Sequence, residues 1–246
     1  MKTRLDQLLV QRELAATREK AQALIISGQV LVNEQKSDKP GRSIDDTSTI
    51  RVLESLPYAS RGGLKLAAAL DAFALDLTGR ICLDVGASTG GFTDCMLQRG
   101  ASHVHAIDVG TNQLDWKLRN DPRVTVREKL NARYLTLADI GEQVDFITMD
   151  VSFISATMIL PQLPALLLPG ALGMVVLVKP QFEVGREQVG KGGIVRDPAL
   201  HQQSIDKVSE AAEGIGLRQA GVIPSPITGA TGNHEFLLYL NRHPQL

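Results

Sequence analysis

The sequence is poor in cysteine, in aromatic residues and in net charge. Its 246 residues include two cysteines and five histidines, and the formal net charge is −1. Two cysteines are too few for a disulfide-stapled scaffold, and neither Cys82 nor Cys95 has the spacing of a metal ligand. We therefore expect two reduced, buried thiols, histidines with structural roles, and no metal site.

Long hydrophobic runs are also missing. Runs such as residues 170–178 are far shorter than the about 20 apolar residues that span a bilayer. The first residues alternate charge with leucine and show no apolar signal core. These absences argue against a membrane protein and predict a cytoplasmic one. A composition with 43% hydrophobic and 22% charged residues is typical of a globular fold.

The near-neutral net charge of the chain conceals an uneven distribution of charged residues. Residues 1–42 carry eight basic and five acidic side chains, a net charge of +3, so the rest of the chain is acidic. A basic segment can bind nucleic acid even when the whole chain is neutral, although this signal is weak by itself.

Residues 1–56 predict a separate small domain. Residues 3–13 and 16–30 have helical spacing, with Thr17 as N-cap and Gly28 as a left-handed end. Residues 29–36 and 48–54 alternate as strands do. Residues 57–63 contain Pro57 and two glycines and predict a linker to a second domain at 64–246.

The second domain alternates strands with helices. Such a pattern predicts a mostly parallel sheet with helices on both faces. The predicted helices include 64–75 and 201–216, and the predicted strands are 81–85, 103–109, 123–128, 145–151, 172–179, 217–227 and 234–241.

Charged residues end four of these strands. Asp84, Asp108, Asp150 and Lys179 close the strands near 85, 108, 150 and 179. Ligands of open parallel sheets bind beyond the carboxyl ends of the strands, so these residues predict a site at one edge. The alternative for each is a charge that merely ends a strand in solvent.

A glycine-rich turn, G-A-S-T-G-G, follows the first of these strands at residues 86–91. It lacks the Lys and Ser/Thr of a phosphate-binding P-loop, and Ser88 stands where a dinucleotide motif has its second glycine. Asp84 suits an ammonium group, met directly or through water, and Asp108 suits ribose hydroxyls. S-adenosylmethionine carries both groups, whereas a nicotinamide oxidoreductase is disfavoured.

Several stretches together resemble the haemolysin-A (TlyA) family of ribosomal RNA 2′-O-methyltransferases, which belongs with the FtsJ-like, or RrmJ-like, methyltransferases. They are YASRGGLKL, LDVGASTGGFTDCML, AIDVG, MDVSFIS, VKPQFE and GNHEFLLYL. Residues 3–33 resemble the alpha-L RNA-binding module of a small-subunit ribosomal protein. The resemblance implies an α/β fold: a Rossmann-like, seven-stranded methyltransferase domain with an antiparallel last strand, preceded by a small α/β RNA-binding domain.

The family's catalytic pattern, Lys-Asp-Lys-Glu, falls on Lys65, Asp150, Lys179 and Glu235. The strand-end argument also finds Asp150 and Lys179, whereas Lys65 and Glu235 rest on the resemblance. Without it, Lys65 would be a solvated residue opening a helix and Glu235 a charge at a strand edge.

The predicted ligand-binding residues divide into two sets. For S-adenosylmethionine they are Asp84, Gly86, Ser88, Gly90, Gly91, Phe92, Asp108, Val109, Asn131 and Ala132. For RNA phosphate they are Arg4, Arg18, Lys20 and Arg61, each of which could equally be solvated surface. The implied partner is ribosomal RNA or a ribosomal subunit, and no obligate protein partner is evident.

The implied reaction methylates a ribose 2′-hydroxyl, of a cytidine. Aligning oxygen, methyl and sulfur can supply about 7–11 kcal/mol, and removing the hydroxyl proton adds about 10²–10⁴-fold. We expect Lys179 to be the base and Asp150 to orient it. Lys65 is expected to provide a second cation and to position the hydroxyl, and Glu235 to complete the network.

Two further features have open interpretations. The glycine-rich, basic segment 183–198 is either a plain loop or a lid that touches RNA phosphate. Trp116 is expected to pack rather than to stack on a base. Competing functions are a non-catalytic RNA-binding or ribosome-assembly factor and a membrane-active haemolysin.

Overall fold

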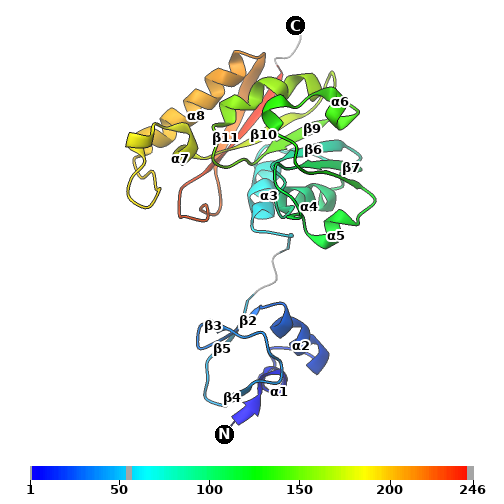
Figure 1. The fold of residues 1–246 in the computed structure, drawn as a ribbon, viewed down its shortest axis with the longest axis vertical. Coiled ribbons are helices and arrows are strands. Elements are labelled where there is room, and N and C mark those ends of the chain that lie inside the picture. The colour runs from blue at the N-terminus through cyan, green and yellow to red at the C-terminus, as the bar shows by residue number, and fades with distance from the viewer. Residues whose placement is uncertain (1, 54–56, 243–246) are drawn as a thin grey trace. The chain divides into compact units, whose positions relative to one another are not determined.

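The computed structural model describes residues 2–53 and 57–242 and divides into two compact units, Met1–Leu56 and Pro57–Leu246 (Figure 1). The end of the strand predicted over 48–54, and the predicted domain boundary at 56, lie outside the described residues. Each unit has its own hydrophobic core.

The N-terminal unit packs two helices against short strands. Helices α1 (Leu5–Gln11) and α2 (Arg18–Ile26) bury Leu5, Leu9 and Ile25. Strand β1 (Lys2–Arg4) pairs antiparallel with β4 (Ser43–Asp45), and β2 (Val30–Val32) lies between β3 (Gln35–Lys36) and β5 (Ile50–Val52). The predicted helix over 3–13 therefore begins at Leu5, because residues 2–4 are extended and paired.

The predicted ends of the second helix are confirmed. Thr17 Oγ1 accepts a hydrogen bond from the backbone N–H of Lys20 at 3.2 Å, and Gly28 has φ +70°. The single strand predicted over 29–36 is wrong, because β2 and β3 form a hairpin. Asn33 and Glu34 have φ of +49° and +63°, which makes the tight two-residue turn that joins the strands.

The predicted linker over 57–63 is instead packed onto the second unit. The backbone N–H of Ala59 donates to the Asp94 carboxylate at 2.7 Å, and helix α3 (Gly62–Ala72) begins inside the segment. A Cβ at Gly63 would lie 2.3 Å from the Tyr58 side chain. The glycines therefore permit close packing of Tyr58 rather than a free hinge.

The second unit contains the predicted seven-stranded sheet, in the order β11-β12-β10-β9-β6-β7-β8 (Figure 1). Strands β6 to β10 pair in parallel, and β12 is antiparallel to both β10 and β11, which confirms the predicted fold class. The strands are β6 (Ile81–Val85), β7 (His103–Ile107), β8 (Val124–Arg127), β9 (Phe146–Met149), β10 (Gly173–Val178), β11 (Leu217–Pro224) and β12 (Phe236–Arg242).

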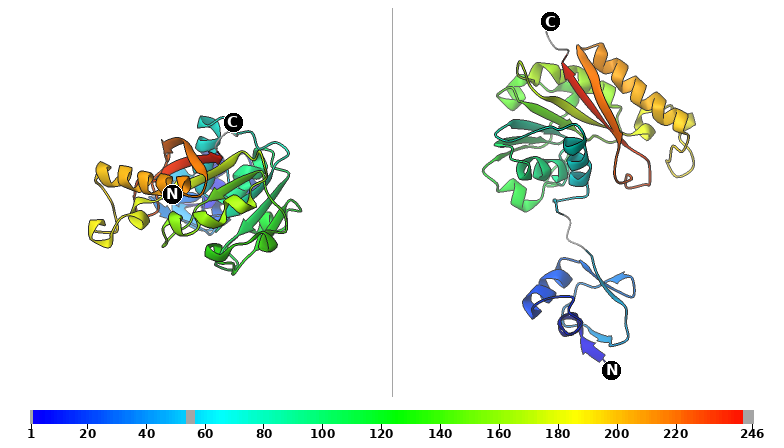
Figure 2. Two further views of the ribbon diagram at one scale, coloured as in Figure 1. Left: turned by 90° about the horizontal axis from the view of Figure 1, so that it is seen from above. Right: turned by 180° about the vertical axis from the view of Figure 1, so that it is seen from behind.

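Helical elements cover the two faces of this sheet (Figure 2). Helices α3 and α4 (Gly91–Gln98) pack on one face. Helix α8 (Pro198–Glu213) and three short 3₁₀ turns cover the other. The 3₁₀ turns are η2 (Ala156–Met158), η3 (Leu160–Gln162) and η4 (Pro164–Leu166), and the remaining helical elements are α5 (Trp116–Arg119), α6 (Leu137–Ile140), α7 (Pro180–Glu183), η1 (Ala132–Tyr134) and η5 (Arg186–Gln188).

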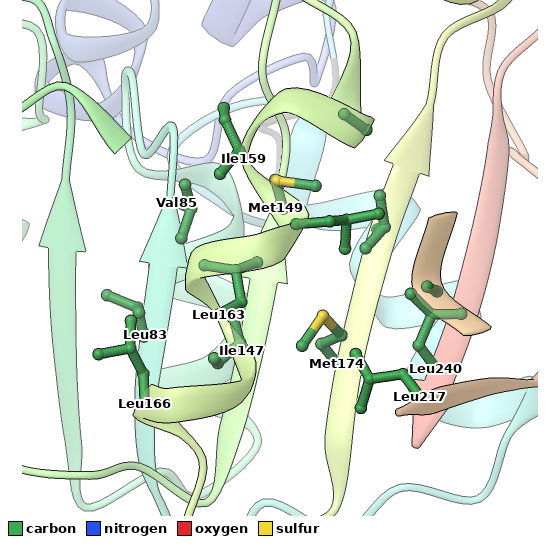
Figure 3. Packing of buried hydrophobic residues seen from close by; sticks show 14 of the residues in the cluster. Leu83, Val85, Ile147, Met149, Ile159, Leu163, Leu166, Met174, Leu217 and Leu240 are labelled. Atoms are coloured by element: carbon green, nitrogen blue, oxygen red, sulfur yellow. The ribbon is translucent and has the colours of Figure 1, made fainter. Parts of the chain in front are cut away.

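Side chains of β6 alternate between the two faces, as a period of two requires. Leu83 and Val85 join the core under the 3₁₀ turns, where Figure 3 shows them near Leu163 and Leu166. Cys82 faces α3 and α4, and both Cys82 and Cys95 are buried free thiols, as expected. Because the strands are covered on both faces, solvent reaches them chiefly at the strand ends.

Candidate active site

The four predicted catalytic residues line one cavity of about 640 Å³, here called the larger cavity. Strands β9 and β10 are parallel neighbours, so Asp150 and Lys179, which follow them, leave the sheet at the same edge. Strand β12 is antiparallel to β10 with Phe236 opposite Val178, so Glu235 reaches that edge from the other direction. Lys65 comes from the first turn of α3.

These four side chains form two ion pairs. Lys65 Nζ lies 2.5 Å from Glu235 Oε2, and Lys179 Nζ lies 2.6 Å from Asp150 Oδ1. The side chains of Lys65, Lys179 and Glu235 are at most 10% exposed, so each charge depends on its partner for compensation. Asp150 thus lies beside Lys179 and Glu235 beside Lys65, whereas the role of Asp150 in orienting Lys179 stays a prediction.

Segments on both sides of the cavity approach these groups closely. A Cβ at Gly86, where φ is +86°, would lie 2.4 Å from the carbonyl oxygen of Asp150. A Cβ at Gly229 would lie 2.5 Å from Glu235 Oε1. Glycine at these two positions therefore lets the backbone meet the catalytic segments directly.

The glycine-rich turn also begins helix α4. Gly90 caps the helix with φ +94°, and a Cβ at Gly91 would lie 2.2 Å from Ser60 Oγ. Ser88 is left-handed, with φ +48°. The buried ring of Phe92 follows and lines the larger cavity. The predicted residues of this turn thus lie at the cavity, except that Gly90 packs against Leu118.

A smaller cavity of about 490 Å³ shares Gly86, Ser88, Asp150, Ser152 and Phe153 with the larger one. The other predicted cofactor residues line this smaller cavity beside an apolar wall: Asp108, Val109, Asn131 and Ala132, with Ile107, Leu130 and Ile159.

Asp108 fixes the turn between the two cavities. Its Oδ2 accepts a hydrogen bond from the Ser88 N–H at 2.8 Å, and its Oδ1 accepts one from the Gly110 N–H at 2.7 Å. Asp108, at the end of the second predicted strand, thus lies where the sequence predicts it, beside the apolar wall of the smaller cavity.

Asp84 lies elsewhere than expected. It lines neither cavity and is only 1% exposed, because alternation along β6 directs it toward α4. Thr93 donates to its Oδ2 at 2.6 Å and Thr148 to its Oδ1 at 3.0 Å. Burial raises the pKa of the Asp84 carboxyl to about 6, although these hydrogen bonds favour the charged form. The structure therefore does not support a direct contact between Asp84 and a ligand ammonium group.

The sequence analysis did not predict three residues at this edge, which are Ser152, Phe153 and Phe182. Ser152 Oγ accepts a hydrogen bond from Lys179 Nζ at 2.8 Å. Phe153 is 92% exposed with φ +66°, and its ring centroid lies 5.4 Å from that of Phe182. All three closely follow Asp150 or Lys179, so the strand-end rule could have found them.

The predicted lid segment contributes Val189 and Gly193 to the larger cavity. Asn233 is fully buried and ties this segment to the strand β12 side. Its Oδ1 accepts from the Val195 N–H at 2.9 Å, and its Nδ2 donates to the Gly193 carbonyl at 2.8 Å. The basic residues Arg186, Lys191 and Arg196 are exposed, and contact with RNA stays a prediction.

Two predicted RNA contacts of the N-terminal unit converge on one acid. Arg4 and Arg18 each donate through Nε to the fully buried Asp6 at 3.0 Å, and Gln22 donates at the same distance. The Arg4 guanidinium is the main cause that holds the pKa of Asp6 well below its usual range. The side chains of Arg4 and Arg18 remain 43% and 49% exposed.

The other predicted contacts lie at the surface. Lys20 and Arg61 are exposed, and Arg61 lines the larger cavity next to α3. Trp116 is 75% exposed at the start of α5, so the expected packing role is wrong. In the part of the chain that the structure describes, no helix is long and apolar enough to cross a membrane, and no three potential ligands gather around a metal position.

Two family models match the chain. The model described as FtsJ-like methyltransferase matches residues 58–242, and the model for the S4 domain matches residues 3–50.

Known proteins resemble nearly the whole chain. Bacillus subtilis (strain 168) YqxC is 52% identical over 242 residues, which is 98% of this chain and 86% of that protein. The 16S/23S rRNA (cytidine-2′-O)-methyltransferase TlyA of Mycobacterium tuberculosis (strain ATCC 25618 / H37Rv) is 47% identical over 241 residues, 97% of this chain and 90% of TlyA. A solved hemolysin-like structure from Streptococcus thermophilus has a TM-score of 0.76 at 46% identity, covering 99% of this chain and 90% of that one.

Proposed function

The chain belongs to the FtsJ-like methyltransferase family, and from this premise we propose that it methylates the 2′-hydroxyl of a cytidine ribose in ribosomal RNA, with S-adenosylmethionine as donor. The resemblance read from the sequence is confirmed by the family models and by the relatives. The relative TlyA is named for this reaction on 16S and 23S rRNA.

One observation carries the proposal: Lys65, Asp150, Lys179 and Glu235 surround one cavity as two ion pairs. A solvated charge at a strand end would not need a buried partner. Three of these side chains are at most 10% exposed, and such groups cluster where a protein does chemistry.

The smaller cavity has the features that the donor requires. Its apolar wall of Ile107, Leu130 and Ile159 suits an adenine ring, and Asp108 suits ribose hydroxyls. The methionine end would then lie along the glycine-rich turn at Gly86 and Ser88, which both cavities share. When bound, S-adenosylmethionine supplies a methyl group activated by its sulfonium, whose leaving group is a neutral thioether.

The residues of the larger cavity perform the proton chemistry. With both substrates bound, the ribose oxygen would bond to the methyl carbon and the sulfur would keep the electron pair of the broken carbon–sulfur bond. The 2′-hydroxyl proton passes to Lys179 Nζ in its neutral form, 2.6 Å from Asp150 Oδ1. Lys65 directs the hydroxyl and is held in turn by Glu235. The exposed Phe153 ring, at the rim of both cavities, lies where a target base would enter.

The remaining assignments follow from this substrate. The N-terminal unit binds the ribosomal RNA through exposed cations such as Arg4, Arg18 and Lys20, and the protein works in the cytoplasm, without a membrane or an obligate protein partner. A non-catalytic RNA-binding role is the alternative, and the complete Lys-Asp-Lys-Glu set disfavours it.

Methyl transfer to isolated ribosomal subunits tests the proposal. Purified protein is incubated with small and with large subunits and labelled S-adenosylmethionine, and the digested RNA is analysed by mass spectrometry. We expect 2′-O-methylcytidine. Methyl groups on a base, or no incorporation into either subunit under conditions where RNA binds, would refute it.

A further inference from the structure

We propose that Ser152 is a positioning residue for methyl transfer: its hydroxyl and the Asp150 carboxylate together direct the amine of Lys179 toward the bound ribose. The inference rests on the proposed function and adds a residue to it. Neither the Lys-Asp-Lys-Glu pattern nor the family match assigns a role to Ser152.

Lys179 makes one hydrogen bond and one ion pair. Its Nζ donates to Ser152 Oγ at 2.8 Å and lies 2.6 Å from Asp150 Oδ1. A lysine nitrogen can donate three hydrogen bonds, and within residues 2–53 and 57–242 Ser152 is the only hydrogen-bond acceptor of this nitrogen. Lys179, Asp150 and Ser152 all line the larger cavity, which is the space left for a substrate hydroxyl.

The segment that carries Ser152 is anchored at both ends. The Asp150 N–H donates to the Val85 carbonyl of β6 at 2.9 Å. At the far end, the Ala156 N–H donates to Glu183 Oε1 at 2.7 Å, and Glu183 belongs to α7, the helix that follows Lys179. Both ends are therefore fixed to elements that also position the amine.

The turn after Ser152 is unusual. Phe153 has φ +66°, a left-handed conformation that bulky residues seldom adopt, and its side chain is 92% exposed. Such conformations persist where the surroundings impose them, and they cluster at functional sites. Here the turn keeps the Ser152 hydroxyl within reach of Lys179.

The direction of the Lys179 amine affects the proton-transfer step and not the binding of the substrates. As a base, the neutral amine has two N–H bonds and one electron pair. One N–H bond is held by Ser152 Oγ, and the Asp150 carboxylate, 2.6 Å from Nζ, keeps the nitrogen in place beside it, so that the electron pair can face the ribose hydroxyl in the larger cavity. Without the serine hydroxyl, the amine loses this hydrogen-bond acceptor and rotates about its last carbon–nitrogen bond. Turnover then falls, whereas binding of RNA and donor does not change.

Two variants of Ser152 test the inference. Ser152→Ala should lower kcat about tenfold, with the KM for the ribosomal substrate and the Kd for S-adenosylmethionine within about twofold. Ser152→Thr keeps the hydroxyl and should restore kcat to within about threefold of wild type. Ser152 is exposed, so the Tm should not change. Ser102→Ala, an exposed serine at the amino end of β7, is the matched control and should keep wild-type turnover.

Four results would contradict the positioning role of Ser152. An unchanged kcat in Ser152→Ala, a loss that appears in KM or Kd instead, a lowered Tm, or a threonine variant as slow as the alanine variant would each overturn the positioning role. If the wild-type protein transfers no methyl group, the proposed function itself fails. An active wild type with an unaffected alanine variant removes only this inference.

Discussion

Lys65 and Glu235 stand 170 positions apart in the sequence, yet their side chains form a buried ion pair of 2.5 Å at the larger cavity. The pair joins the first turn of α3 to the segment before β12. Desolvating two charges costs several kcal/mol each, so this pair survives only through close mutual contact. Removing one partner should therefore affect both stability and activity.

Glu235→Gln should lower the free energy of unfolding by about 3 kcal/mol, because it leaves the Lys65 ammonium buried without a counter-charge. The double variant Lys65→Met/Glu235→Leu should regain most of that stability while remaining inactive. Urea denaturation and methyl transfer assays measure the two effects. A double variant less stable than Glu235→Gln would show that the pair itself stabilises the fold.

Lys179→Ala should reduce methyl transfer by about 10²-fold or more, because the proton of the 2′-hydroxyl loses its acceptor. Binding of S-adenosylmethionine, measured by calorimetry, should persist, since Lys179 lines only the larger cavity and not the smaller one. Lys179→Arg serves as control, because a guanidinium keeps the charge but cannot accept the proton. Turnover within about tenfold of wild type in Lys179→Ala would rule out the base assignment.

Asp84 should make the fold less stable as the pH rises from about 4 to 6. Burial raises its pKa from 3.8 to about 6, so in this window the folded protein binds more protons than the unfolded chain. The stability that the protonated carboxyl contributes is complete below 3.8 and is lost as the pH passes 6.

Asp84→Asn should remove that dependence. Its unfolding free energy relative to wild type should increase by about 1–3 kcal/mol between pH 4 and pH 7, because two pKa units correspond to about 3 kcal/mol at most. Thermal denaturation at several pH values measures the difference. A variant whose relative stability does not vary over this range would contradict a raised pKa at Asp84.

Asp6→Asn should weaken binding to ribosomal RNA, although it makes the N-terminal unit more positive. Asp6 holds the guanidinium groups of Arg4 and Arg18 in fixed positions, and ordering them only on binding reduces affinity. We expect about a threefold to tenfold loss at constant salt concentration, measured by filter binding. Asp38→Asn, an exposed acid of the same unit, is the control for added charge. Tighter binding by Asp6→Asn would indicate that charge alone controls this contact.

Asp6 also predicts a loss of stability in acid. Its pKa is depressed, so it contributes stability above the unfolded value of 3.8 and loses it as the pH falls toward the folded value. Circular dichroism of the wild-type protein should show unfolding that begins below about pH 4, and Asp6→Asn should lack that component.

Local sequence patterns were sufficient to predict most of the strands of the methyltransferase sheet and their order along the chain. Alternating strands and helices predict a parallel sheet, and parallel neighbours must end at the same edge. Because of that geometry, the sequence alone assigns Asp150 and Lys179 to one site. Patterns failed where conformation has little sequence signal: Asn33 and Glu34 make a hairpin turn without the usual glycine, and residues 57–63 pack although their composition is typical of a linker.

The sequence by itself determined the order of the elements, the covered faces of the sheet and the residues at the strand ends, because these depend on hydrophobic period and neighbouring positions. Only the tertiary structure decided that Glu235 pairs with Lys65, that Ser152 holds Lys179, and that Asp84 lies behind the glycine-rich turn. Such contacts join segments distant along the chain. Their distances depend on how helices and loops pack against the sheet, which no local pattern encodes.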